Sequence, residues 1–189
     1  MKHRRVAVPA LLLLSVSALA AAQSATVTPQ VAKSGVRASF DHLKGLAGRW
    51  KGKANTDGPT PDSYPVQVSL RVTSGGDALM QEMTPEGRAD DPARGDDDPL
   101  TMFYLDGDRL MLTHYCDIGK NRPRMTAKVS PDGKSVEFDF LDLTGETTRG
   151  HMHRALFTFI DADHHTEDWT YVMPNGKGSR AHLEMARAK

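Results

Sequence analysis

The 189-residue sequence carries 24 basic and 24 acidic residues and no formal net charge. This balance gives no reason to expect binding to nucleic acid or to an anionic membrane surface. The sequence has one cysteine, Cys116, so no disulfide can form within it, and the fold must depend on an apolar core.

A signal peptide is predicted at residues 1–22. The segment begins with the basic residues Met-Lys-His-Arg-Arg and continues as an almost wholly apolar run to Ala20. This run is shorter than the ~20 residues of a membrane-spanning helix, and small residues follow it, as at signal-peptide cleavage sites. Cleavage is expected before Gln23, with the site after Ala20 as second choice. The expected protein is therefore periplasmic or secreted, with no membrane span.

A flexible leader at 23–36 and a single domain at 37–189 are expected after the cleavage site. The leader residues are small, polar and aperiodic. A short helix is predicted at 40–47, with Ser39 as its cap. Apolar residues recur there at helical spacing, at Phe40, Leu43 and Ala47.

From Trp50 onward, apolar and polar residues alternate with a period of two, which is typical of strands with one buried face. Short runs of Gly, Asp, Asn and Pro separate these segments and indicate tight turns. About ten strands are predicted, at 50–55, 66–73, 79–83, 100–105, 109–116, 123–129, 135–141, 151–160, 165–173 and 179–187.

Short turns join antiparallel neighbours, whereas parallel crossovers would need a dozen or more residues. Sequential strands without a helical layer bury their apolar face best by closing on themselves. The sequence therefore predicts an all-β, antiparallel up-and-down barrel with a short N-terminal helix, and a two-sheet sandwich is the alternative. The acid-rich connection at 84–99 lacks the alternating carboxylates of a calcium loop and is interpreted as a solvated, mobile loop at the barrel mouth.

The segment Leu46-Ala47-Gly48-Arg49-Trp50-Lys51-Gly52-Lys53 resembles the opening of the calycin-like barrels, namely the lipocalins, fatty-acid-binding proteins and nitrobindins. Those families have a short helix followed by Gly-x-Trp on the first strand. The resemblance implies that the indole of Trp50 plugs one end of a barrel. Residues 112–116 and 150–154 also resemble stretches of exported bacterial proteins of unknown function, a similarity that implies no activity.

Nitrobindins hold a haem through a histidine on the final strand, and His182 stands in a comparable place. The resemblance therefore implies a haem-binding barrel, with His182 as the haem ligand, as one alternative. Within 179–187, however, the apolar residues occupy odd positions. Alternation consequently predicts that His182 shares a solvent-facing side with Arg180 and Glu184.

Alternation also selects candidate residues for the lumen. The even residues of 109–116, the odd residues of 151–160 and the aromatic face of 165–173 are taken as interior. The opposite choice on 151–160 is nearly as good, since it would bury Met152, Leu156 and Ile160. The predicted ligand-binding residues are His114, Cys116, His151, His153, Glu167, Trp169 and Tyr171.

An apolar cup with a few polar groups is typical of a site for a small organic molecule. The predicted function is an exported barrel that binds a small, partly apolar ligand, without a cofactor. No enzymatic activity is predicted, because nucleophile elbows, phosphate loops and dinucleotide fingerprints are missing.

Two further interpretations stay open. A zinc site is compatible with the spacing of His151 and His153, with His114 as a third ligand. A structural domain is the other, in which the interior polar groups satisfy one another by hydrogen bonding. His164 and His165 follow a tight turn and are expected to face solvent.

Overall fold

The computed structural model describes residues 35–57, 61–85, 98–115 and 118–189. The predicted signal peptide at 1–22, the leader up to residue 34 and most of the acid-rich loop lie outside these ranges, as does Cys116. No helix among the described residues is long and apolar enough to cross a membrane.

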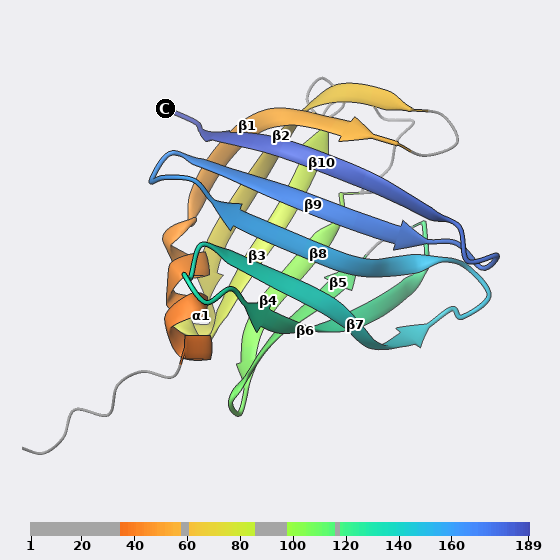
Figure 1. Ribbon diagram of the computed structural model, residues 1–189, viewed down its shortest axis with the longest axis horizontal. Coiled ribbons are helices and arrows are strands. Elements are labelled where there is room, and N and C mark those ends of the chain that lie inside the picture. Colours follow the sequence, from red (N-terminus) through yellow and green to blue (C-terminus); the bar gives the residue numbers. More distant parts are fainter. Residues whose placement is uncertain (1–34, 58–60, 86–97, 116–117) are drawn as a thin grey trace, which may run out of the picture. The chain divides into compact units, whose positions relative to one another are not determined.

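In the described residues, ten antiparallel strands form a closed barrel, with the helix α1 (Gly35–Gly45) at one end (Figure 1). Each strand pairs with its neighbours along the chain, and the first strand also pairs with the last. The predicted up-and-down barrel is confirmed, and the sandwich does not form. The strands are β1 (Gly48–Thr56), β2 (Asp62–Thr73), β3 (Ala78–Pro85), β4 (Leu100–Asp106), β5 (Arg109–Tyr115), β6 (Asn121–Val129), β7 (Ser135–Gly145), β8 (His151–Phe159), β9 (His164–Val172) and β10 (Gly178–Arg187).

The helix begins earlier than its predicted start at residue 40. Ser39 was expected to cap it, but the Ser39 hydroxyl lies within the helix and donates to the carbonyl of Gly35 at 2.9 Å. A serine side chain can make this bond to the preceding turn without ending a helix. The helix therefore includes two residues that were assigned to the leader.

Trp50 closes the end of the barrel next to α1, as the resemblance implied. Its indole is fully buried, and Nε1 donates to the carbonyl of Leu46 at 2.7 Å. The guanidinium of Arg187 lies 4.2 Å from the ring centre. Phe40 and Leu43 of α1 belong to the same buried cluster, so the helix and the indole seal this end together.

Gly52 allows β1 and β10 to approach closely. A Cβ at this position would lie 2.0 Å from the carbonyl oxygen of Glu184 and 2.6 Å from Sδ of Met185. Any side chain would therefore push the two strands apart at the seam that closes the barrel. The second glycine of the Gly-x-Trp-x-Gly segment thus has a steric role here.

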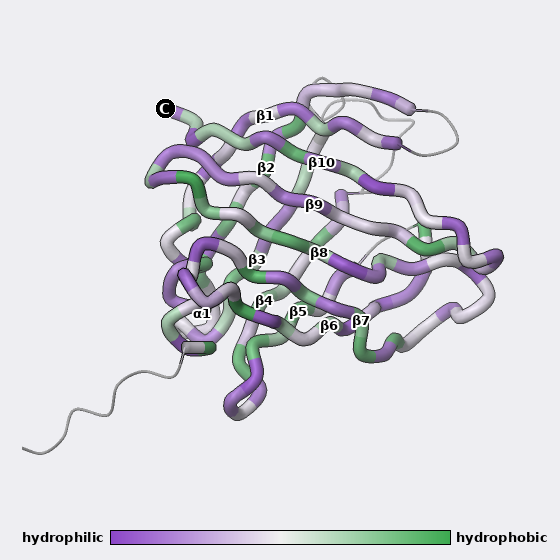
Figure 2. Tube along the Cα trace, in the orientation of Figure 1, coloured by the Kyte–Doolittle hydropathy of each residue, from purple (hydrophilic) through white to green (hydrophobic). Residues whose placement is uncertain are grey.

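The strands alternate hydrophobic and hydrophilic residues, which Figure 2 shows along the chain. The inward side chains include Phe103, Phe138 and Phe157, whose ring centroids lie 5.3 to 6.1 Å apart. Trp169 packs edge-on against Phe157 at 5.7 Å and marks the boundary of this packed core. Its other side lines a cavity.

Candidate functional site

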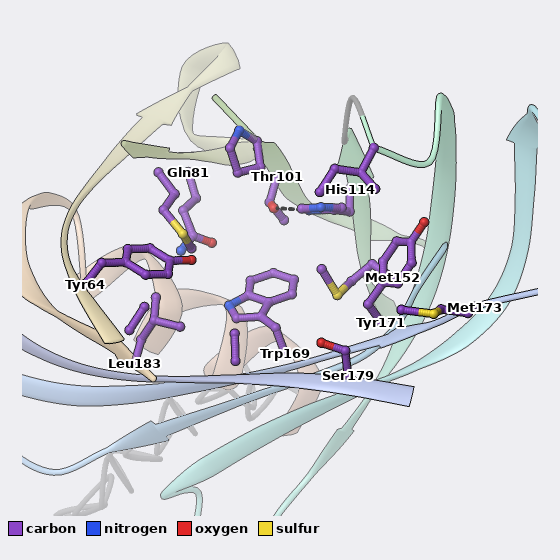
Figure 3. Close-up of a pocket in the computed structure, with 15 residues that line it drawn as sticks. Tyr64, Gln81, Thr101, His114, Met152, Trp169, Tyr171, Met173, Ser179 and Leu183 are labelled. Atoms are coloured by element: carbon purple, nitrogen blue, oxygen red, sulfur yellow. Dashed lines mark hydrogen bonds between the residues drawn. The ribbon is translucent and has the colours of Figure 1, made fainter. Parts of the chain in front are cut away.

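A cavity of about 360 Å³ occupies the part of the barrel away from Trp50. Its walls are mainly aromatic rings, thioethers and small side chains (Figure 3). Ile118, two-thirds exposed, is also among its lining residues. The apolar lining residues are Ala54, Tyr64, Met83, Pro99, Ile118, Met152, Trp169, Tyr171, Met173, Ala181 and Leu183.

The polar part of the described lining is small and uncharged. It consists of Gln81, Thr101, His114 and Ser179, together with the hydroxyls of two tyrosines. None of the described lining residues is Asp, Glu, Lys or Arg. Apolar walls with a few polar groups are the usual composition of a pocket that orients a small organic molecule.

His114 contributes an imidazole that is buried in the wall of the cavity. Cross-strand pairing places it opposite Thr101, and Nδ1 lies 2.9 Å from the Thr101 hydroxyl (Figure 3). Burial lowers the pKa of His114 to about 4, so the ring is neutral at pH 7. Its Nε2 atom has no hydrogen-bond partner among the residues that the structure describes. One face of this site therefore offers an unused polar atom.

A buried carboxylate, Glu167, organises the polar groups at the inner end of the cavity. It accepts hydrogen bonds from Gln81 Nε2 at 2.9 and 2.8 Å, and from Trp169 Nε1 at 2.9 Å. His165 Nε2 lies 3.1 Å from the same carboxylate. Glu167 is fully buried, so these contacts replace its solvation.

The carboxylate also determines which way the Gln81 amide points. A carboxylate only accepts hydrogen bonds, so the nitrogen of Gln81 must face Glu167. The Gln81 oxygen, Oε1, is then directed elsewhere and has no partner in the described part of the chain. Since Gln81 lines the cavity, its buried oxygen is a second unused polar atom of this site.

Four of the predicted lumen residues lie inside the barrel. His114, Trp169 and Tyr171 line the cavity, and Glu167 is buried behind Gln81 and Trp169. Cys116 lies outside the described residues. The alternation on β5 and β9 therefore identified interior side chains correctly.

The placement of His151 and His153 in the lumen was wrong. The pairing of β8 with β9 shifts between Met152 and Arg154, which leaves His153 without a partner across the ladder. This bulge reverses the alternation, so that Met152 lines the cavity while His153 is exposed and His151 half-buried. Both imidazoles pack against Phe140, with centroids 4.4 and 5.2 Å away.

Beyond the bulge, the predicted alternation holds on β8. Ala155, Phe157 and Phe159 are buried, as the odd parity required. The opposite parity is correct for Met152 alone, since Leu156 is half-buried and Ile160 is exposed. A single inserted residue thus divided the strand into two segments of opposite parity.

The fold does not place the residues that a zinc site or a haem site in the lumen would require. His114 lies inside the barrel, apart from His151 and His153, so the proposed zinc ligands do not converge. His182 is about two-fifths exposed and its Nδ1 lies 2.7 Å from Asp168, on the face opposite to the buried Leu183. It does not fit a haem ligand in the lumen. Within the described ranges, no three His, Cys, Asp or Glu side chains are grouped as metal ligands.

His165 was expected to face solvent after its turn, but it is buried. Its ring packs edge-on against Trp50 at 4.3 Å, and Nε2 contacts Glu167. The alternation that joins His165 to Glu167 and Trp169 is the better guide here. Of the two histidines that follow this turn, only His164 is exposed.

Four polar lining residues were missed by the sequence analysis, namely Tyr64, Gln81, Thr101 and Ser179. Gln81 shares parity with the buried Leu79, and Thr101 shares parity with the buried Phe103. Alternation could have placed both inside the barrel. Tyr64 precedes the clear alternation of β2, and its neighbour Pro65 interrupts the strand pattern.

Comparison with known proteins finds similarity in structure and not in sequence. No protein-family model matches the chain, and no curated protein matches it. A protein of unknown function from the DUF3598 family of Nostoc punctiforme PCC 73102 is 16% identical, with a TM-score of 0.50 over 77% of this chain and 49% of that one. The chain thus spans about half the length of that protein.

Two further solved structures match along nearly their whole length. Rv2717c from M. tuberculosis is 15% identical, with a TM-score of 0.61 over 80% of this chain and 98% of that one. The S-type phycobiliprotein lyase CPES from Guillardia theta is 11% identical, with a TM-score of 0.50 over 85% and 99% of the two chains. At these identities the comparisons show a shared fold alone.

Proposed function

We propose that this chain is an exported, non-enzymatic barrel that binds a small, partly apolar molecule in the cavity beside Trp169. The observation that carries the proposal is the combination of an open volume of about 360 Å³ with Gln81 Oε1 and His114 Nε2 in its lining, two of the four buried side-chain polar atoms that have no partner among the described residues. Small barrels can fill their interior with side chains, and this one does so only on the side of Trp50.

The same observation favours ligand binding over a purely structural interior. A filled interior would require the polar groups to satisfy one another. The Glu167 cluster meets that requirement for its carboxylate, but Gln81 Oε1 and His114 Nε2 do not take part. A buried polar group without a partner costs about 1–3 kcal/mol, which a bound molecule can recover.

The direct test is mass spectrometry of what co-purifies with the protein from its own host. We expect a small molecule in the native complex that is released on unfolding. The Ala181→Phe variant, which introduces a ring at the cavity wall, should lose it. Ala186 lies on the other face of β10 and is exposed, so Ala186→Phe is the matched control and should retain it. Equal retention by both variants, or no bound molecule in the native protein, would refute the proposal.

A further inference from the structure

The charge of the cavity limits what it can bind, provided that the proposed function holds. The described lining contains no cation that could pair with an acid and no carboxylate that could pair with an amine. The buried carboxylate of Glu167 is occupied by Gln81, Trp169 and His165. Because burying an unpaired charge costs far more than burying a neutral polar group, the interior favours an uncharged molecule.

The hydrogen bond that a bound molecule would make with Gln81, at the inner end of the cavity, can run in only one direction. The amide nitrogen of Gln81 is directed at Glu167, whose two oxygens lie 2.9 and 2.8 Å from Nε2. The remaining atom, Oε1, can only accept a hydrogen bond. Gln81 is 2% exposed, so bulk water does not reach this oxygen freely. A matching molecule must therefore present a donor, an O–H or N–H group, at this point.

The hydrogen bond at the second polar contact, His114 Nε2, can run in either direction. His114 is 4% exposed, and its Nδ1 is engaged by the hydroxyl of Thr101. A threonine hydroxyl can donate or accept, so a neutral imidazole can present Nε2 as either an acceptor or a donor. The Trp169 ring, whose centroid lies 5.4 Å from that of His114, supplies an aromatic surface beside it.

We infer that the cavity selects an uncharged, largely apolar molecule with a hydroxyl or N–H group that donates to Gln81 Oε1, while a second polar atom of the molecule contacts His114 Nε2 and its apolar body lies against Trp169 (Figure 3). A carboxylate in the same orientation would place a negative oxygen against the Gln81 acceptor. Two acceptors that face each other repel and form no hydrogen bond, so the cavity disfavours a molecule with a carboxylate at this point.

The test uses three probes with one ring system: 2-naphthol, naphthalene and 2-naphthoate. Their affinities at pH 7 are measured by titration followed by ¹H–¹⁵N NMR, with shifts at the cavity residues as the sign of binding there. We expect 2-naphthol to bind about tenfold more tightly than naphthalene, since one additional hydrogen bond to a buried acceptor has that effect. We expect 2-naphthoate to bind more weakly than 2-naphthol by at least the same factor.

Two variants test the assigned contacts. Gln81→Met removes the acceptor at similar size and should reduce the preference for 2-naphthol over naphthalene to less than about threefold. His114→Phe leaves the Glu167 cluster intact. It should lower the affinity of 2,6-dihydroxynaphthalene, whose two hydroxyls can contact both Gln81 and His114, and it should lower the affinity of 2-naphthol by a smaller factor. His151 lies outside the cavity. His151→Phe should therefore change neither the preference for 2-naphthol over naphthalene nor the affinity of 2,6-dihydroxynaphthalene.

The outcomes separate this inference from the proposed function. If all three probes bind the native protein with similar affinity and Ala181→Phe abolishes that binding, the cavity binds small molecules but the inference is wrong. Tightest binding of 2-naphthoate would overturn it equally. If none of the probes binds, the inference fails together with the proposed function.

Discussion

Acid should destabilise the fold through His114. Burial lowers the pKa of this side chain from 6.5 to about 4. Above about pH 6.5 the imidazole is neutral in both the folded and the unfolded chain and has no effect. As the pH falls below that value, the unfolded chain takes up a proton that the folded chain resists, so stability decreases until the pH reaches the folded pKa. With ~1.4 kcal/mol per pKa unit, the loss is about 2 kcal/mol at pH 5 and about 3 kcal/mol at pH 4.

The window from pH 6.5 to 4 separates this effect from that of most carboxylates. Hydrogen bonds to Lys128 and Arg124 hold the pKa values of Asp139 and Asp142 below 3.8, so these groups titrate at lower pH. His151 also has a lowered pKa, chiefly because it is partly buried, and then because His153 is close. The contribution of His114 must therefore be taken as a difference between variants.

The assay is urea-induced unfolding followed by tryptophan fluorescence between pH 7 and pH 4.5. His114→Asn keeps a hydrogen-bonding group for the Thr101 hydroxyl, and His114→Phe keeps a ring in the same space. Whatever their stability at pH 7, both variants should lose about 2 kcal/mol less than the native protein between pH 7 and pH 5. Parallel curves for the native protein and both variants would refute the assignment of a buried, neutral imidazole.

Three other expectations can be checked by simple measurements. Trp50→Ala should lower the free energy of unfolding by about 3–5 kcal/mol, the range for emptying a buried aromatic site, and unchanged urea unfolding would contradict the plugged end. Gly150→Ala should cost about 1–3 kcal/mol, because its Cβ would lie 2.4 Å from a tyrosine ring, whereas Gly178→Ala has 3.7 Å of clearance and should be nearly neutral in the same assay. Mature protein from the periplasm or medium should begin at Gln23 or Ala21 by N-terminal sequencing, and an intact first methionine in the membrane fraction would show that the segment is an anchor.

The fold was predictable because local signals agreed with one another. Period-two alternation located all ten strands, and the short turns between them left an antiparallel meander as the simple topology. The Gly-x-Trp segment also placed Trp50 correctly. The helix start was less predictable, since Ser39 fits both a cap and a helix interior, and only the surrounding packing decides between them.

The site was predictable only where alternation was unbroken. On β5 and β9 it found His114, Glu167, Trp169 and Tyr171. On β8 an inserted residue reversed the parity, and nothing in the sequence of that strand distinguishes a bulge from a regular ladder. Gln81 was overlooked for a different reason. Its importance depends on a contact with Glu167, which lies far away in the chain and is brought close only when the barrel closes.

The seam between β1 and β10 determines when the molecule can complete its folding. Trp50 lies opposite Arg187 across this seam, so the first strand finds its second partner only when the last strand is available. Until then β1 is an edge with unpaired backbone groups, open to association with other chains. Pairing between distant segments is slow compared with the formation of hairpins. The final hairpin should therefore control both the rate of closure and the period during which newly made chains are vulnerable to aggregation.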